Sequence, residues 1–321
     1  MARRAVLAAF LATVLGVTGC GALDSSSSPG DSGGTLEKPK IRVSMMSTID
    51  TASFWLAKDG GYFQREGLEV ETTAAATGQV SLTKLISGDA DIAYSSYTPF
   101  FVAKSKNVAD IRIVADASSA GPGSTAIVAM PSSGVKTVAD LAGKRIGISA
   151  PNTIADTLTK SVLADHNVDA SRVQWVPVPL PNTAEALQHK DIDAGFLAEP
   201  FITQAKRSAG VVVVADTASG TTANFPTAGY GGLGSFVSSA PKTLAAFQRA
   251  MAAATRDAAD RAKIEPLMVK YAKVDADTAA HTGLLTFRSI VDVRELQRVP
   301  DLLLKTGVLT TPVDVATMVA K

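Results

Sequence analysis

The sequence has little of what several large classes of protein require. Cys20 is its single cysteine, which excludes an intrachain disulfide, a cysteine-rich zinc site and a cysteine-ligated cluster. Its 31 Lys and Arg nearly balance its 30 Asp and Glu, so it lacks the basic excess typical of a nucleic-acid-binding protein. Only 6% of the residues are aromatic, but 46% are hydrophobic, so the chain is not largely disordered. A length of 321 residues predicts about two domains.

The familiar signatures of enzymes are also missing. There is no Gly-x-Ser-x-Gly elbow, no His-Glu-x-x-His pair and no phosphate-binding loop. His166, His189 and His281 are scattered along the chain, which favours surface or capping positions. The glycines of 229–234 fit the spacing G-x-G-x-x-G, but no strand-to-helix pattern surrounds them, so they favour a hinge or loop over a nucleotide site. We therefore expect no catalytic residue, no metal site and no cofactor.

The N-terminus has the features of an export signal with a lipid attachment site. Arg3 and Arg4 precede an apolar run at 5–16, which is too short to span a membrane but has the length of a signal core. Residues 17–20 (VTGC) resemble a bacterial lipobox, which implies cleavage before Cys20 and lipidation of its thiol. An ordinary secretory signal and a twin-arginine signal remain open as alternatives.

Residues 20–40 connect this signal to the rest of the chain. After Cys20 they are rich in Ser, Gly, Pro and Asp and show no apolar periodicity, which is typical of a flexible tether. Residues 1–19 are therefore predicted to be a signal peptide, and residues 20–40 a lipidated cysteine with its tether. No stretch approaches 18 consecutive apolar residues, so we expect a soluble domain outside the cytoplasm, lipid-anchored to the cell membrane.

From residue 41 onward, short β-branched runs alternate with helical stretches, a pattern typical of an α/β protein with mainly parallel sheets. Ligands of open α/β sheets bind at the carboxyl ends of strands, and we therefore look for a site there. Strands are predicted at 41–46, 68–74, 92–95, 111–115, 125–130, 145–149, 173–178, 211–215 and 234–238, and helices at 53–59, 80–87, 99–106, 154–166, 183–188, 200–208, 244–273 with a break around Pro266, 275–287, 293–305 and 312–319.

Two short segments have similar sequences. Residues 85–93 (LISGDADIA) and 187–195 (LQHKDIDAG) each contain a helix end, an Asp-x-Asp pair and a strand, and each is soon followed by Pro-Phe. This internal similarity suggests two similar α/β lobes. The paired carboxylates favour turns at strand starts over a catalytic pair.

Four segments resemble one family in the order in which that family carries them. They are residues 58–68 (KDGGYFQREGL), 87–93 (SGDADIA), 138–147 (VADLAGKRIG) and 191–200 (DIDAGFLAEP). The family is that of the substrate-binding proteins of nitrate-, sulfonate- and taurine-type ABC importers, which includes binders of thiamine pyrimidines.

The resemblance implies a bilobal periplasmic-binding-protein fold, in which two α/β lobes are joined by a two-stranded hinge. We expect chain crossings near 123–128 and 227–234, so that residues 41–124 and 230–321 form lobe one and residues 125–229 form lobe two. The glycines at 229, 231, 232 and 234 suit the second crossing because glycine accepts unusual backbone angles.

Polar residues that follow strands or open helices form the candidate ligand site. Hydroxyls and the N–H groups of helix N-termini can hold an anion without a buried lysine or arginine. Two carboxylates, Asp50 and Glu199, would repel a bare anion but would pair with the ammonium of a taurine-like zwitterion. Helix capping and core packing are the structural alternatives for several members. The candidates are Ser47, Thr48, Asp50, Trp55, Gln79, Tyr94, Ser95, Ser96, Asn152, Thr153, Glu199 and Tyr230.

The resemblance implies a substrate-binding component of an ABC importer. We expect it to capture a small organic anion, namely an alkanesulfonate, a taurine-like compound or nitrate, and to deliver it to a permease powered by a separate ATPase. We expect a monomer that does not bind nucleic acid. The open alternatives are a binder of a thiamine pyrimidine precursor or another small aromatic, an extracytoplasmic enzyme on the same fold, and a structural lipoprotein without a ligand.

Overall fold

The computed structural model describes residues 35–320. The predicted signal peptide, Cys20 and the first part of the predicted tether lie outside the described residues. The last part of that tether belongs to the fold, because Glu37 accepts a hydrogen bond from the backbone N–H of Thr243 (3.0 Å) and Lys38 pairs with Asp91 (2.6 Å). Across the described part of the chain, no helix has both the length and the apolar character needed to cross a membrane.

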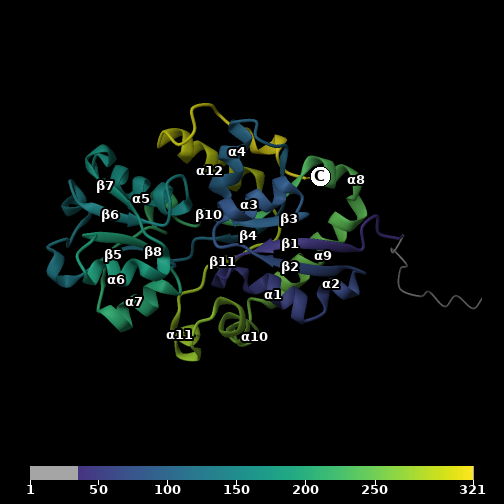
Figure 1. Ribbon diagram of the computed structural model, residues 1–321, viewed down its shortest axis with the longest axis horizontal. Helices are drawn as coiled ribbons and strands as arrows, with labels where there is room; N and C mark the ends of the chain where they lie inside the picture. Colours follow the sequence, from purple (N-terminus) through teal and green to yellow (C-terminus); the bar gives the residue numbers. More distant parts are fainter. Residues whose placement is uncertain (1–34, 321) are drawn as a thin grey trace, which may run out of the picture. The chain divides into compact units, whose positions relative to one another are not determined.

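The larger of two sheets has six strands in the order β11-β4-β10-β3-β1-β2 (Figure 1). β1 pairs in parallel with β2 and β3, whereas β10 runs antiparallel to both β3 and β4. β1, β3 and β4 therefore point the same way, and their carboxyl ends share one edge of the sheet. The strands are β1 (Lys40–Met45), β2 (Glu69–Ala74), β3 (Ile92–Ser96), β4 (Ile111–Ser119), β10 (Pro226–Leu233) and β11 (Thr286–Phe287).

The smaller sheet has five strands in the order β7-β6-β8-β5-β9. β6 pairs in parallel with β7 and β8, and β5 runs antiparallel to β8 and β9. The strands are β5 (Thr125–Ala129), β6 (Arg145–Ile148), β7 (Gln174–Pro177), β8 (Ala194–Ala198) and β9 (Val212–Asp216).

Helices cover both faces of the larger sheet. Tyr94 and Tyr230 share a core cluster with Phe54 and Phe247, which places α1 and α9 on one face. Ala93 packs with Phe100 and Leu303 on the other face, where α4 and α12 lie (Figure 1). The helices are α1 (Ala52–Asp59), α2 (Tyr62–Arg65), α3 (Gly78–Ser87), α4 (Tyr97–Ser105), α5 (Ile154–Asp165), α6 (Thr183–Gln188), α7 (Phe201–Ala209), α8 (Gly234–Ser239), α9 (Pro241–Asp257), α10 (Arg261–Leu267), α11 (Ala276–His281) and α12 (Val293–Lys305).

Two segments join the sheets, residues 120–124 between β4 and β5 and residues 217–225 between β9 and β10. The first overlaps the crossing expected near 123–128. The second lies upstream of the expected crossing at 227–234, because those residues form β10 and the start of α8. The glycines at 229, 231, 232 and 234 are therefore not in a connecting segment. The connecting segments contain Gly121, Gly123 and Gly220, of which Gly123 and Gly220 adopt φ of +71° and +59°.

Steric space explains why β10 is rich in glycine. A Cβ on Gly229 would come within 2.6 Å of the Tyr97 ring, and a Cβ on Gly231 would come within 2.9 Å of the Phe100 ring. Both rings belong to α4, which packs directly on the strand. Glycine therefore allows a helix to approach a central strand closely, and this role replaces the flexible role predicted from the sequence.

Four further sequence predictions are corrected by the structure. Residues 234–238, predicted as a strand, form α8 instead. The helical run expected to break around Pro266 breaks earlier, between α9 and α10, and Pro266 lies inside α10. The helix expected over 275–287 is divided into α11 and β11, and within 312–319 only the 3₁₀ turn Val315–Thr317 is helical.

We predict that Gly229→Ala destabilises the fold by about 1–3 kcal/mol, because the added methyl group overpacks against Tyr97. Urea denaturation followed by circular dichroism measures the change. Gly283→Ala is the matched control, since its Cβ would meet no atom closer than 3.7 Å. Equal stability of the two variants would contradict the steric explanation of the glycines in β10.

Candidate functional site

The shared carboxyl edge of the larger sheet gathers several polar side chains. The turn Ile49–Thr51 follows β1, Ser95 and Ser96 end β3, and Ser118 and Ser119 end β4. β10 begins at the same edge because it is antiparallel to both neighbours. The two segments that lead to the smaller sheet leave and return here, so the edge lies at the junction of the two sheets.

Asp50 is the centre of a hydroxyl network at this edge. The Tyr94 hydroxyl donates to its carboxylate, and the Ser118 hydroxyl approaches the same oxygen at 3.4 Å. Ser118 also exchanges a hydrogen bond of 2.8 Å with the hydroxyl of Thr227, the second residue of β10. Asp50 and Tyr94 were both predicted as site residues, and the structure brings them together.

Tyr94 and Tyr230 lie directly opposite each other on β3 and β10. Their rings are 5.5 Å apart, and both side chains are buried on the α1 and α9 face. Burial, with the nearby charge of Asp50, raises the pKa of both phenols well above the usual value. The Tyr230 hydroxyl differs from that of Tyr94 because it has no hydrogen-bond partner among the described residues.

Asp116 was not predicted from the sequence, although it lies deeper in the same edge. Its carboxylate accepts hydrogen bonds from the Tyr97 hydroxyl (2.7 Å) and the Ala117 N–H (2.9 Å). Burial raises the pKa of Asp116 to about 6, against the lowering effects of these bonds and of the Arg288 charge. The sequence pattern ended the strand at residue 115, and it therefore missed both Asp116 and Ser118.

Several hydroxyls around the edge and the connecting segments are buried without a hydrogen-bond partner in the described chain. Such groups are uncommon in folded proteins, and each calls for an explanation. They include the hydroxyls of Thr48, Ser95, Ser119, Thr125, Thr217 and Tyr230. Thr48 and Ser95 were predicted as site residues, whereas Ser119, Thr125 and Thr217 were not.

The first loop, the start of α3 and the end of β3 hold four further candidates. Ser47 is exposed, whereas Gln79 and Ser96 are partly buried. Ser95 lies on the α3 side of the sheet, where Gly78 leaves it space. These four residues therefore lie at the predicted edge but not within the network around Asp50.

Trp55 packs away from the network. Its indole ring stacks on the Tyr271 ring at 3.7 Å with an interplanar angle of 4°, and its N–H donates to the Thr51 hydroxyl at 3.1 Å. Because Thr51 belongs to the turn that carries Asp50, this hydrogen bond from Trp55 helps to fix the position of the turn.

The candidate residues of the smaller sheet already form hydrogen bonds with other residues of the protein. The Thr153 hydroxyl donates to the Ala150 carbonyl at 2.7 Å, and the backbone N–H of Asn152 donates to Asp156 at 3.0 Å. Glu199 accepts from the N–H (3.0 Å) and hydroxyl (2.8 Å) of Thr203 at the start of α7. It also accepts from the Gly283 N–H at 3.3 Å, so it ties the smaller sheet to the segment after α11.

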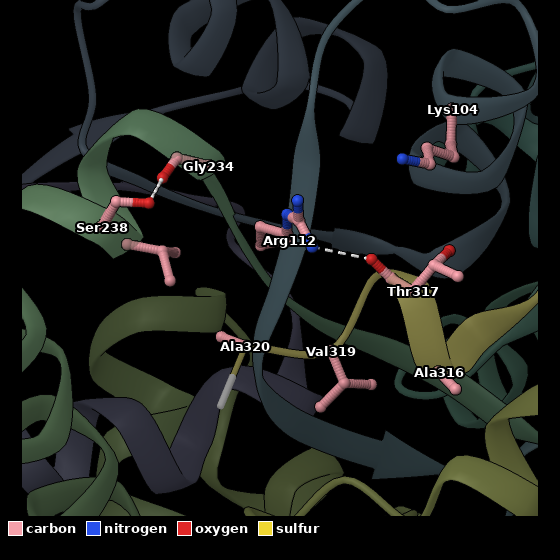
Figure 2. A pocket seen from close by; sticks show the side chains of 9 residues that line it. Lys104, Arg112, Gly234, Ser238, Ala316, Thr317, Val319 and Ala320 are labelled. Atoms are coloured by element: carbon pink, nitrogen blue, oxygen red, sulfur yellow. Dashed lines mark hydrogen bonds between the residues drawn. The ribbon is translucent and has the colours of Figure 1, made fainter.

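A large open cavity lies elsewhere. Figure 2 shows this cavity of about 690 Å³ at the amino end of β4, lined by Lys104, Arg112, α8 and the C-terminal segment. Arg112 donates to the Thr317 carbonyl at 2.7 Å and pairs with Asp110 at 3.1 Å. The cavity contains none of the predicted site residues. Within residues 35–320, no group of three His, Cys, Asp or Glu side chains is arranged to hold a metal ion.

Residues 48–263 match the family model described as NMT1/THI5 like. The chain belongs to the NMT1/THI5-like family. The match covers the turn with Asp50, the ends of β3 and β4, and the whole smaller sheet. A comparison of the sequence with curated proteins found no match.

Solved structures show the fold of this NMT1/THI5-like protein. The periplasmic aliphatic sulphonate binding protein SsuA of Escherichia coli superposes with a TM-score of 0.73 at 18% identity, covering 88% of this chain and 97% of that one. SsuA of Xanthomonas axonopodis pv. citri bound to MOPS gives 0.74 at 18% identity, covering 88% and 98%. The nitrate-binding protein NrtA of Synechocystis PCC 6803 gives 0.70 at 14% identity, covering 87% and 84%. The predicted periplasmic-binding-protein fold is confirmed.

We predict that Asp116→Asn becomes progressively more stable relative to the unaltered chain as the pH rises from about 4 to 6. The folded state holds the Asp116 proton more tightly than the unfolded state, because the folded pKa is about 6. This residue's contribution to stability therefore falls through that range and stays low above it. Urea unfolding at several pH values measures the free energy of unfolding of both proteins. The difference between the variant and the unaltered chain should grow by about 3 kcal/mol over this range. A difference independent of pH would show that Asp116 is not buried as described.

Proposed function

We propose that this chain is the substrate-binding component of an ABC importer, which captures a small organic anion between two lobes and delivers it to a permease. The observation that carries the proposal is the polar edge around Asp50, where both connecting segments meet and where buried hydroxyls lack partners. Unpaired buried polar groups cost free energy unless something hydrogen-bonds to them. A ligand that enters the junction supplies such bonds.

The ligand class follows from the family and from the names of similar structures. Sulfonates, MOPS and nitrate are bound by the proteins to which this chain is similar in fold. We therefore propose an alkanesulfonate, a taurine-like compound or nitrate. Binding rather than catalysis is favoured because all three histidines are exposed and none lies at the polar edge.

We propose that the two sheets with their helices are the two lobes. Strand membership divides the described chain at the connecting segments, so lobe one comprises residues 35–119 and 226–320 and lobe two comprises residues 125–216. Polar contacts would hold this arrangement together. Arg207 of α7 in lobe two pairs with Asp277 of α11 in lobe one, and Arg298 of α12 donates to the Ala223 carbonyl of the second connecting segment at 2.9 Å.

The lobes also share apolar contacts, which a structural lipoprotein without a ligand would be expected to show. One core cluster joins Phe196 and Leu158 of lobe two with Phe100 of lobe one. This cluster lies on the α4 and α12 face, whereas the network of Asp50 and Tyr94 faces α1 and α9. The apolar junction and the polar site therefore lie on different faces of the larger sheet, and a ligand-binding role remains the better supported function.

We further propose that the protein acts outside the cytoplasm as a monomer, anchored by a lipid on Cys20. The lipobox-like residues 17–20 and the polar residues that follow them support the anchor. The partners would be the membrane permease and its separate ATPase.

The ligand class is tested by isothermal titration calorimetry on the chain from Gly21 onward. We expect micromolar or tighter binding of at least one of ethanesulfonate, taurine, nitrate, bicarbonate and a thiamine-type pyrimidine. Circular dichroism confirms that the protein is folded. A folded protein that binds none of these compounds would refute the proposed ligand class, and turnover of a bound compound would favour an enzyme.

The lipid anchor is tested by Cys20→Ala in the full-length chain expressed in a bacterial host. Without the thiol no lipid can be attached, so we expect the variant to leave the membrane fraction for the soluble extracytoplasmic fraction. Cell fractionation and immunoblotting measure the distribution, with Ser25→Ala in the tether as the matched control. A variant that stays with the membrane after signal removal contradicts the anchor.

A further inference from the structure

The negative charge at the polar edge has no counter-ion of its own among residues 35–320. Asp50 is partly exposed, and its carboxylate is held only by hydroxyls, those of Tyr94 and Ser118. Among residues 35–320, no lysine, arginine or histidine forms an ion pair with it. A carboxylate in a partly dehydrated position favours a cation or strong N–H donors as its neighbour.

Comparable carboxylates at the opposite edges of the sheets form ion pairs with lysine or arginine. Asp91, just before β3, pairs with Lys38 at 2.6 Å, and Asp193, just before β8, pairs with Arg145 at 2.8 Å. Each also accepts a backbone N–H at the start of a neighbouring strand. The two repeated Asp-x-Asp motifs thus contain carboxylates with structural partners, whereas the carboxylate beside the candidate site has none.

Two hydroxyls without partners among the described residues belong to the neighbours of the Tyr94–Asp50 hydrogen bond. The Tyr230 hydroxyl is fully buried and unpartnered, on the same face as Tyr94 and directly opposite it in register. The Tyr230 ring lies 5.5 Å from the ring of Tyr94, whose hydroxyl bonds Asp50. The Thr48 hydroxyl, two residues before Asp50, is also buried without a partner.

These groups match an ammonium better than they match an anion. A primary ammonium has three N–H donors and no acceptor, so it can bond a carboxylate oxygen and two hydroxyl oxygens at once. Nitrate has only acceptors and would lie against the like charge of Asp50. The charge of Arg288 acts on Asp116, and the Arg288 Nε atom is buried without a hydrogen-bond partner among the described residues.

We propose that the ligand carries an amino or ammonium group and that Asp50 is the acceptor that recognises it, with the hydroxyls of Tyr230 and Thr48 beside it. The inference rests on the proposed binding function and narrows it. Amino-bearing sulfonates and aminopyrimidines belong to the class, whereas nitrate and simple alkanesulfonates do not.

The decisive comparison uses two probes that differ only at the amino group. Taurine and 1-propanesulfonate have the same sulfonate and chain length, with an ammonium in one and a methyl group in the other. On the chain from Gly21 onward, calorimetry should give a Kd for taurine at least about tenfold lower than that for 1-propanesulfonate. A 4-aminopyrimidine and the same ring without its amino group form a second matched pair for an aromatic ligand.

Asp50→Asn then separates recognition from folding. The amide still accepts the Tyr94 hydrogen bond but has no charge, so we expect about a 10–100-fold loss for the amino-bearing probe and little change for its partner. Asp301→Asn removes one exposed carboxylate on α12 as the matched control and should change neither Kd. Tyr230→Phe tests the unpartnered hydroxyl and should weaken only the amino-bearing probe.

The outcomes distinguish this inference from the proposed function. If 1-propanesulfonate or nitrate binds as tightly as taurine and Asp50→Asn changes neither, the protein is a binding protein and the inference is wrong. If no member of either pair binds the folded protein, the proposed ligand class fails and the inference fails with it. If Asp50→Asn does not fold, the preference of the unaltered protein between the paired probes still decides the question.

Discussion

The antiparallel pairing of β10 between β3 and β4 is the constraint on which the rest of the structure depends. Because β10 returns from the smaller sheet into the middle of the larger one, its first residues lie beside the last residues of its neighbours. Both connecting segments are thereby brought to one edge. The same pairing sets Tyr230 opposite Tyr94 and brings Thr227 to Ser118, which builds the network around Asp50.

This pairing also demands glycine. A strand with ordinary side chains on its α4 face could not lie under Tyr97 and Phe100, since those rings occupy the space of the missing Cβ atoms of Gly229 and Gly231. The ring of Tyr97 is thereby positioned so that its hydroxyl reaches Asp116 at 2.7 Å. Glycines that suggest mobility in the sequence are thus part of close packing in the fold, and the buried polar edge depends on them.

The sequence predicted those parts of the fold that local periodicity encodes. The regular apolar runs of β1, β5 and α12 were placed within about two residues, because their apolar side chains recur with the period of a strand or of a helix. β10 was missed because glycine carries no apolar pattern. The end of β4 was missed because Asp116 and Ser118 are polar, and their burial comes from pairing with β10 and β11, which are distant in sequence. The role of Glu199 was left open for the same reason, since Gly283 is one of its partners.

The predicted site residues of the two sheets differ in how their polar groups are satisfied. In the smaller sheet, Thr153 and Glu199 are engaged by neighbouring backbone, and they contribute to helix starts and to the contact between the sheets. In the larger sheet, Tyr230 and Thr48 keep unused hydrogen-bonding capacity beside a carboxylate without a counter-ion. A fold that leaves these groups unpaired is less stable than one that pairs them, by about 1–3 kcal/mol for each group. The proposed ligand, with its N–H donors, would recover that deficit on binding, so the same groups that weaken the free protein would favour the bound state.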